Sequence, residues 1–259
     1  MRRLTLAFAA SALMLAAFEA SAQAARSVAA PAYVAAAVAD PGRPAEDTAR
    51  DANRHPAELA VFAGVKPGDT VLDVLPGGGY FTRIFAKIVG PTGRVVAVVP
   101  SEIAGKYDSE KNARAAAAAY PNVMVAVEPL LQAHPEHANA VDVIWTSQNY
   151  HDFHTPLLGS PDVAELNRQV FQVLKPGGVY IVVDHVAQAG SGARDADTLH
   201  RIDPALVRKE VEAAGFVFDG ESNLLRNPAD DHTKLVFDPS IRGKTDQFVY
   251  RFRKPARPG

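Results

Sequence analysis

The chain has 259 residues, 47% of them hydrophobic, which suits a single α/β domain with a sizeable core. It contains no cysteine, and this excludes disulfide bonds, thiolate metal sites and a cysteine nucleophile. The formal net charge is -2 and no basic run precedes the last few residues, so nucleic acid is not an expected partner.

The first 24 residues have the pattern of a secretory signal peptide. Arg2 and Arg3 form a short basic start, an apolar run covers Leu4 to Phe18, and small residues follow up to cleavage positions after Ala22 or Ala24. An uncleaved membrane anchor is the rival interpretation, but the apolar run is short for a spanning helix. We therefore expect a periplasmic or secreted protein without a stable membrane anchor after cleavage.

Residues 25–45 are rich in alanine, proline and valine, and this composition predicts a flexible lead-in. We expect residues 46–259 to form one domain. A short helix is predicted over residues 47–53, and a second helix begins at Pro56 and ends at Gly64.

A glycine-rich stretch follows the first predicted strand. Residues 71–74 have strand propensity, Leu75-Pro76-Gly77-Gly78-Gly79 forms a turn, and residues 80–89 place apolar side chains at helical spacing. Glycines let a backbone approach a ligand closely, and the free amides at a helix start can receive an anionic or polar group. The stretch predicts the first half of a βαβ unit with a ligand at the turn.

Strands and helices then alternate along the chain. Further strands are expected at residues 95–99, 123–127, 141–146, 179–183, 216–218 and 247–252, and helices at residues 103–119, 163–174 and 204–214. This alternation predicts a doubly wound α/β sheet. Ligands of such sheets bind outside the carboxyl ends of the strands, where the strand order reverses.

Histidine and aspartate gather where two of these strands end. His151 and Asp152 follow the fourth strand, and Asp184 and His185 close the fifth. An imidazole titrates near neutral pH and can act as a general base or acid, while a neighbouring carboxylate fixes its tautomer. We predict that these four residues are catalytic, with Tyr150 polarising a substrate oxygen.

A metal site is the rival use of the histidines. His151-x-x-His154 and His134-x-x-His137 have ligand spacing, and Asp184 or His185 would supply a third ligand. Both pairs lie in loops that contain proline, and no compact signature such as His-Glu-x-x-His is present. The expectation is therefore that no metal is bound.

Three stretches together resemble the class I S-adenosylmethionine-dependent methyltransferases. They are residues 71–79 with the acid and the glycines, Leu-Lys-Pro-Gly-Gly at residues 174–178, and Val-Glu-Ala-Ala-Gly-Phe at residues 211–216. The resemblance covers roughly residues 59–253. The chain is also similar to an exported branch of these methyltransferases that has Pro-Gly-Gly-Gly in the cofactor loop. This resemblance implies a Rossmann-like sheet of seven strands, the last antiparallel, and S-adenosylmethionine as cofactor.

The resemblance also implies cofactor-binding residues. Asp73 would order the loop, Gly77, Gly78 and Gly79 would admit the cofactor, and Glu128 would meet the adenine.

Two positions depart from the family pattern. Leu75 stands at the first glycine position, and Val99 stands where an acid usually holds the ribose hydroxyls. Glu102 would have to reach back to replace that acid.

Three functions stay open from the sequence. The first is an exported S-adenosylmethionine-dependent methyltransferase acting on a small molecule. S-adenosylmethionine is made and used in the cytoplasm, so the alternative is a cofactor-independent periplasmic lyase or hydrolase in which His151 and His185 form an acid-base pair. The third is a non-catalytic periplasmic binding protein.

Overall fold

The computed structural model describes residues 30–130 and 138–256. Their centre is one sheet of seven strands in the order β3-β2-β1-β4-β5-β7-β6. Strands β1 to β5 run parallel, and β7 is antiparallel to both of its neighbours, β5 and β6. The strands are β1 Thr70–Val74, β2 Arg94–Pro100, β3 Val123–Glu128, β4 Val141–Ser147, β5 Leu174–His185, β6 Val217–Ser222 and β7 Gln247–Arg253. The predicted Rossmann-like sheet with an antiparallel last strand is confirmed.

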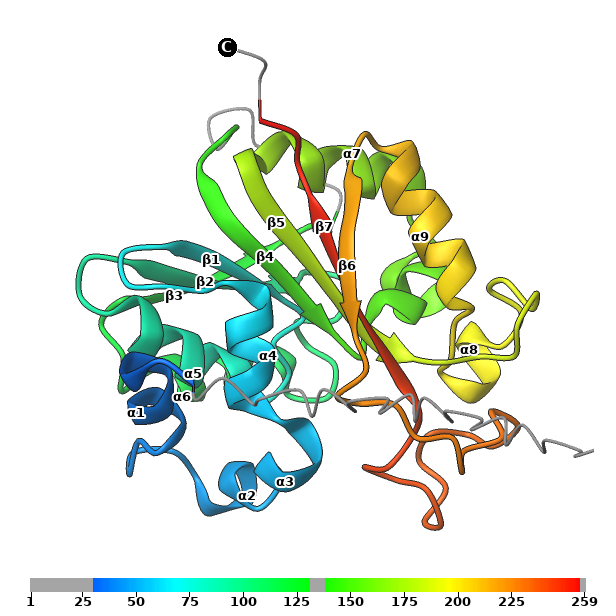
Figure 1. Cartoon of the computed structure of the whole chain (residues 1–259), viewed down its shortest axis with the longest axis horizontal. Coiled ribbons are helices and arrows are strands. Elements are labelled where there is room, and N and C mark those ends of the chain that lie inside the picture. The colour runs from blue at the N-terminus through cyan, green and yellow to red at the C-terminus, as the bar shows by residue number, and fades with distance from the viewer. Residues whose placement is uncertain (1–29, 131–137, 257–259) are drawn as a thin grey trace, which may run out of the picture.

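Helices cover the sheet in two groups (Figure 1). The helices α1, α4, α5 and α6 lie by the half of the sheet that contains β1 to β3, and α7 and α9 lie by the other half. Their bounds are α1 Ala32–Val38, α2 Ala45–Thr48, α3 Asp51–Arg54, α4 Pro56–Ala63, α5 Tyr80–Val89, α6 Ser109–Ala117, α7 Val163–Val173, α8 Ala196–Leu199 and α9 Pro204–Ala213, with 3-10 helices η2 Tyr150–His154 and η3 Pro156–Leu158. Within the described ranges, no helix has the length and apolarity needed to cross a membrane.

The side chains on the two faces of the sheet belong to two separate hydrophobic cores. Side chains alternate between faces along a strand, so Val71 and Val143 join the core under α1 and α5. Ile144 and Val182 join the core under α7 and α9. A near-continuous apolar strand is the sequence pattern that this two-sided burial requires.

The predicted flexible lead-in over residues 25–45 is wrong for its described part, residues 30–45. Val34 and Ala37 of α1 are buried in the same core as α5, because their spacing of three places both on one helix face. Arg43 then holds the following segment to Asp51 through two hydrogen bonds of 2.8 and 2.7 Å. The folded domain therefore begins before residue 46, whereas the predicted signal peptide lies outside the described residues.

The helix predicted over residues 103–119 is shorter than expected. Irregular turns occupy the segment before α6, and Tyr107 and Asp108 adopt left-handed backbone conformations, both with φ of 54°. Few L-residues adopt such angles within a helix, so α6 begins only at Ser109.

The glycine bend between β1 and α5 contains two kinds of glycine. Gly79 begins α5 with φ of 77°, and a Cβ placed on it would lie 2.2 Å from the Cβ of Ala116 in α6. Cβ positions on Gly77 and Gly78 would meet no atom within 4 Å. Gly79 therefore lets α5 pack closely on α6, and only Gly77 and Gly78 leave open space for a ligand. Gly79 thus has a packing role, and the prediction that the three glycines admit the cofactor stays a prediction.

We expect Gly79→Ala to lower the free energy of unfolding by about 2–4 kcal/mol, since it adds overpacking to a strained backbone. Gly78→Ala is the matched control, because it adds the same methyl group to open space and should stay within about 0.5 kcal/mol of wild type. Urea unfolding of both variants checks this, and equal losses would contradict it.

Candidate active site

The glycine bend and the histidine turn meet at the carboxyl edge of the sheet. Asn149, between β4 and η2, donates hydrogen bonds from Nδ2 to the carbonyl oxygens of Leu75 and Ser147, at 3.1 and 2.8 Å. Strands β1 and β4 are neighbours, and the strand order reverses between them. The site therefore lies where a doubly wound sheet holds its ligands.

Asp184 is the buried anchor of this edge. Its carboxylate is fully buried and accepts the backbone amides of His151 and His185, each at 2.7 Å. It also accepts the ring Nδ1 of His151 at 2.9 Å. Burial alone would raise the pKa of Asp184, but the ring and backbone amide of His151, together with the nearby His185, hold that pKa below its ordinary value.

His151 presents its ring nitrogen Nε2 to the site. Because Nδ1 donates to the Asp184 carboxylate, Nε2 of the neutral ring is an acceptor, and it lies 3.1 Å from Nδ1 of His200. Burial lowers the pKa of His151, yet the neighbouring Asp184 outweighs this and raises the pKa above its usual value.

His200 was not among the predicted catalytic residues. It follows α8 in a left-handed conformation with φ of 53°, and α8 packs against η2. The next residues return to the sheet edge, where Ile202 pairs with Val186. Burial and the nearby His151 lower the pKa of His200. No local pattern indicates this approach, since 49 positions separate the two histidines and the contact depends on the path of the loop after β5.

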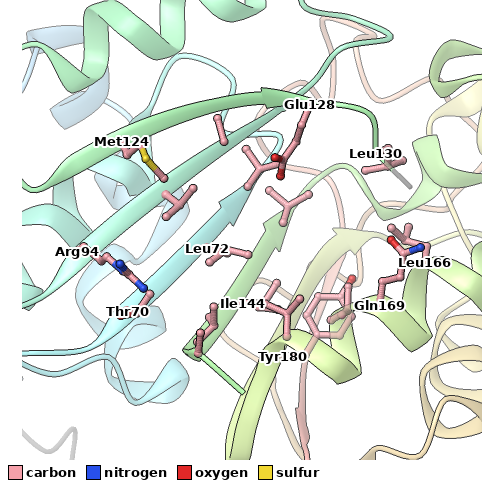
Figure 2. A pocket seen from close by; sticks show the side chains of 18 of the residues that line it. Thr70, Leu72, Arg94, Met124, Glu128, Leu130, Ile144, Leu166, Gln169 and Tyr180 are labelled. Atoms are coloured by element: carbon pink, nitrogen blue, oxygen red, sulfur yellow. The ribbon is translucent and has the colours of Figure 1, made fainter. Parts of the chain in front are cut away.

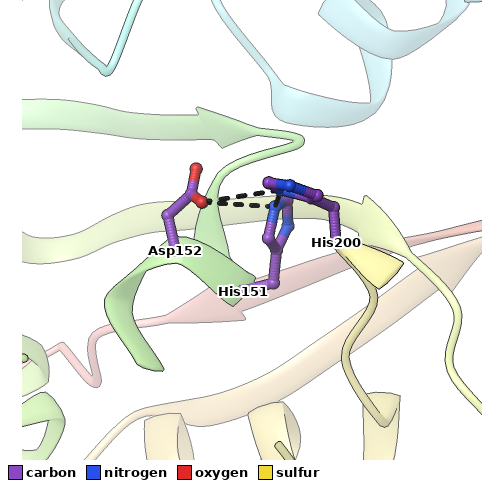
Figure 3. A group of neighbouring side chains, drawn as sticks. All are labelled: His151, Asp152 and His200. Carbon is purple, nitrogen blue, oxygen red and sulfur yellow. Dashed lines mark hydrogen bonds and ion pairs between the residues drawn. The ribbon is translucent and has the colours of Figure 1, made fainter. Parts of the chain in front are cut away.

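Asp152 completes the cluster (Figure 3). Its Oδ1 lies 3.4 Å from Nε2 of His151 and 3.9 Å from Nδ1 of His200. The residue is only 8% exposed, and this oxygen has no hydrogen-bond partner. Burial, opposed in part by His151, raises the pKa of Asp152 to about 6.

His185 turns away from this cluster. Its Nδ1 lies 2.7 Å from Oγ1 of Thr245, and its ring centre is 6.2 Å from that of His151. Burial lowers the pKa of His185 to about 4, so the ring is neutral at physiological pH. The structure thus brings His151 next to His200, and the acid-base pair of His151 and His185 stays a prediction.

Tyr150 is a core residue, which corrects its predicted role at the substrate. Its side chain is fully buried, and its hydroxyl lies 3.0 Å from Oε2 of Glu210 and accepts Nδ2 of Asn167 at 2.8 Å. Burial and Glu210 raise the pKa of Tyr150 well above its ordinary value. The hydroxyl therefore joins η2 to α7 and α9.

We expect Tyr150→Phe to lower the free energy of unfolding by about 1–3 kcal/mol, because it leaves buried polar partners unsatisfied. Tyr107→Phe is the control, as Tyr107 is 78% exposed and should tolerate the change. Urea unfolding gives the comparison. An unchanged stability of Tyr150→Phe, with loss of turnover alone, would restore a direct role at the substrate.

Asp73 faces α5 and is closed off from solvent. Its Oδ2 accepts the hydroxyl of Thr82 at 2.5 Å, so the pair ties the end of β1 to the helix beyond the glycine bend. The carboxyl group is 3% exposed, and burial raises its pKa to about 7. Asp73 therefore fastens the end of β1 to α5, and its role toward the cofactor stays a prediction.

The raised pKa of Asp73 gives a pH dependence of stability. Between the unfolded pKa of about 4 and the folded pKa of about 7, the folded state holds a proton that the unfolded state releases. Stability should therefore fall as pH rises through this window, by up to about 1.4 kcal/mol per pH unit from this residue. The free energy of unfolding of wild type minus that of Asp73→Asn, measured across the window, should show this slope. A flat difference would contradict it.

The two glutamates predicted to meet the cofactor have different surroundings. The Glu102 carboxylate accepts the amide of Leu130 at 3.2 Å and so fastens the loop after β3, whereas its contact with a ribose stays a prediction. Glu128 ends β3 and extends over a cavity of about 180 Å³ (Figure 2). The cavity has a mainly apolar lining that includes Leu72 and Val98, and His151, Asp152 and His200 do not line it.

Arg54 adds a cation beside the glycine bend. Its guanidinium carbon lies 4.3 Å from the ring centre of Tyr80, and Nη2 donates to Oγ of Ser147 at 3.3 Å. Burial and the nearby Arg50 lower the pKa of Arg54 to about 10. Among the described residues, no carboxylate forms an ion pair with it. With the open space at Gly77 and Gly78, this cation fits a ligand that carries a carboxylate.

Comparison with known proteins gives three kinds of likeness. The family model described as "Methyltransferase domain" matches residues 65–220. The ubiquinone/menaquinone biosynthesis C-methyltransferase UbiE of Escherichia coli O1:K1 / APEC is 32% identical over 188 residues, which are 71% of this chain and 64% of that protein. The chain thus spans less than two thirds of this relative.

Two solved structures share the fold. A SAM-dependent methyltransferase from Aquifex aeolicus is 20% identical with a TM-score of 0.55, over 77% of this chain and 89% of its own. The [4+2]-cyclase SpnF is 18% identical with a TM-score of 0.59, over 79% of this chain and 81% of its own.

Proposed function

Because the chain belongs to the class I S-adenosylmethionine-dependent methyltransferase family, we propose that it methylates a small molecule that carries an oxygen or nitrogen group. S-adenosylmethionine is the family's cofactor, and when bound it supplies an electrophilic methyl group. One observation carries the proposal. The open glycines, the guanidinium of Arg54 and the cluster around His151 share one sheet edge and are joined there by Asn149 and Ser147.

One set of residues binds the cofactor and another binds the acceptor molecule. Gly77 and Gly78 leave room for the cofactor, and Arg54 pairs with its carboxylate. His151, Asp152 and His200 bind the polar group of the acceptor. The protein's main contribution is alignment of the acceptor atom with the methyl carbon, since positioning two reactants removes part of the barrier to their reaction.

Oxygenated ring compounds are the acceptor class to test first. The relatives named for ubiquinone and menaquinone biosynthesis support this choice. The partner is then a small molecule, and we propose no stable association with nucleic acid or membrane.

We also propose that residues 1–24 direct export to the periplasm or beyond the cell. The basic start, the apolar run and the small residues support this. An exported enzyme would meet S-adenosylmethionine only where that compound leaves the cytoplasm. The affinity of the protein for S-adenosylmethionine is therefore the first property to measure.

Isothermal titration with S-adenosylmethionine tests the cofactor assignment. We expect saturable binding to wild type, and a fall in affinity of about 10-fold or more in Arg54→Met, because a charge-assisted hydrogen bond is lost. Arg50→Met is the matched control. Arg50 already pairs with Asp47 and is half exposed, so affinity should change by less than about 3-fold.

The absence of binding at millimolar cofactor would contradict the proposal. Turnover of an oxygenated substrate without cofactor, lost in His151→Ala and kept in Gly77→Ala, would establish the lyase or hydrolase alternative. Retention of a ligand without any product would establish the binding protein.

A further inference from the structure

Three metal-ligand atoms converge at the histidine turn. They are Nε2 of His151, Oδ1 of Asp152 and Nδ1 of His200, and they lie within 4.8 Å of one another (Figure 3). We propose that these residues form a binding site for one divalent transition-metal ion of the zinc type. The expectation from sequence is that no metal is bound. The proposal departs from it and uses His200 where the sequence pattern offered His154, whereas His134 and His137 lie outside the described residues.

The separations of these atoms suit a metal. They are 3.1 Å between the two nitrogens, 3.4 Å from Nε2 of His151 to the carboxylate, and 3.9 Å from His200 to the carboxylate. A tetrahedral ion with bonds of about 2.0–2.1 Å holds its ligands about 3.3–3.4 Å apart. The 3.9 Å separation exceeds that spacing by about 0.5 Å, and the 3.1 Å separation is shorter by about 0.2 Å.

Asp184 provides the outer support that such a site needs. It accepts Nδ1 of His151 at 2.9 Å, which directs the lone pair of Nε2 toward the proposed ion. Metal-binding histidines almost always donate their other nitrogen in this way. Asp184 is itself fixed by the amides of His151 and His185.

The unsatisfied oxygen of Asp152 is an independent indication. A hydrogen bond between the two imidazoles satisfies their nitrogens, but Oδ1 of Asp152 is left buried without a hydrogen-bond partner. A buried polar atom without a partner costs about 1–3 kcal/mol. A cation between the three residues would satisfy this oxygen as well.

The ligand chemistry selects the metal class. Two imidazoles and one carboxylate suit zinc, cobalt or iron, whereas magnesium prefers oxygen ligands. The His200 side chain is 30% exposed, so the site is open to solvent on one side. Three protein ligands with an open position are typical of catalytic metal sites. Under the proposed methyltransferase function, on which this role rests, that position would hold the acceptor's oxygen.

The test uses cobalt as the probe, on the full chain without an affinity tag. Titration of metal-free protein with Co²⁺ should give the visible absorption of a four- or five-coordinate ion with a stoichiometry of one. Zn²⁺ should abolish this absorption by displacement, and Mg²⁺ should not. His200→Ala should weaken Co²⁺ binding by more than about 100-fold, since even the loss of an outer partner costs 10–100-fold.

His154→Ala is the matched control, because His154 lies in the same 3-10 helix but pairs with Glu210. It should bind Co²⁺ as wild type does. Asp184→Asn should weaken binding by about 10–100-fold while keeping the absorption. Circular dichroism of each variant separates loss of ligand from loss of fold.

Wild-type protein without a cobalt spectrum, or a spectrum unchanged in His200→Ala, would overturn the metal site. Titration with S-adenosylmethionine on metal-free protein is read separately. Cofactor binding without metal binding would refute this inference alone, and metal binding without cofactor binding would refute the methyltransferase proposal alone.

Discussion

The site depends on one buried carboxylate. Asp184 stands near the end of β5, where water cannot reach it, and stays ionised because two backbone amides and the His151 ring donate to it. A buried charge is tolerated only when such donors compensate it. The carboxylate in turn fixes the start of η2, the tautomer of His151 and the direction of its Nε2. Removal of the charge would disturb all three at once.

Much of the fold follows from local patterns in the sequence. Apolar strands, glycine turns and helical spacing gave the seven strands and the bend at Gly77, because each pattern concerns residues close together in the chain. The site was predicted in part. His151, Asp152 and Asp184 stood out because they end neighbouring parallel strands, and the carboxyl ends of such strands share one edge.

The remaining errors have physical reasons. His200 reaches His151 only through the irregular loop after β5, and no periodicity describes such a path. Tyr150 stands beside a catalytic candidate in sequence, but one step along the 3-10 helix turns its side chain into the core. The alanine-rich lead-in has a composition typical of a linker, yet Val34 and Ala37 pack in the hydrophobic core with residues of α5, a contact that only the folded domain provides. In each case a contact distant in sequence outweighs the local pattern.

The placement of β7 between β5 and β6 has a consequence for synthesis and folding. Both neighbours of β7 are made earlier, and until residues 247–253 emerge each of them has an unpaired edge. The hydrogen bond between His185 and Thr245 likewise forms only after Thr245 has been made. The sheet therefore closes only after residues 247–253 have been made, and such long-range pairing is slow. A nascent polypeptide that stops short of β7 would expose two strand edges that can pair with other chains.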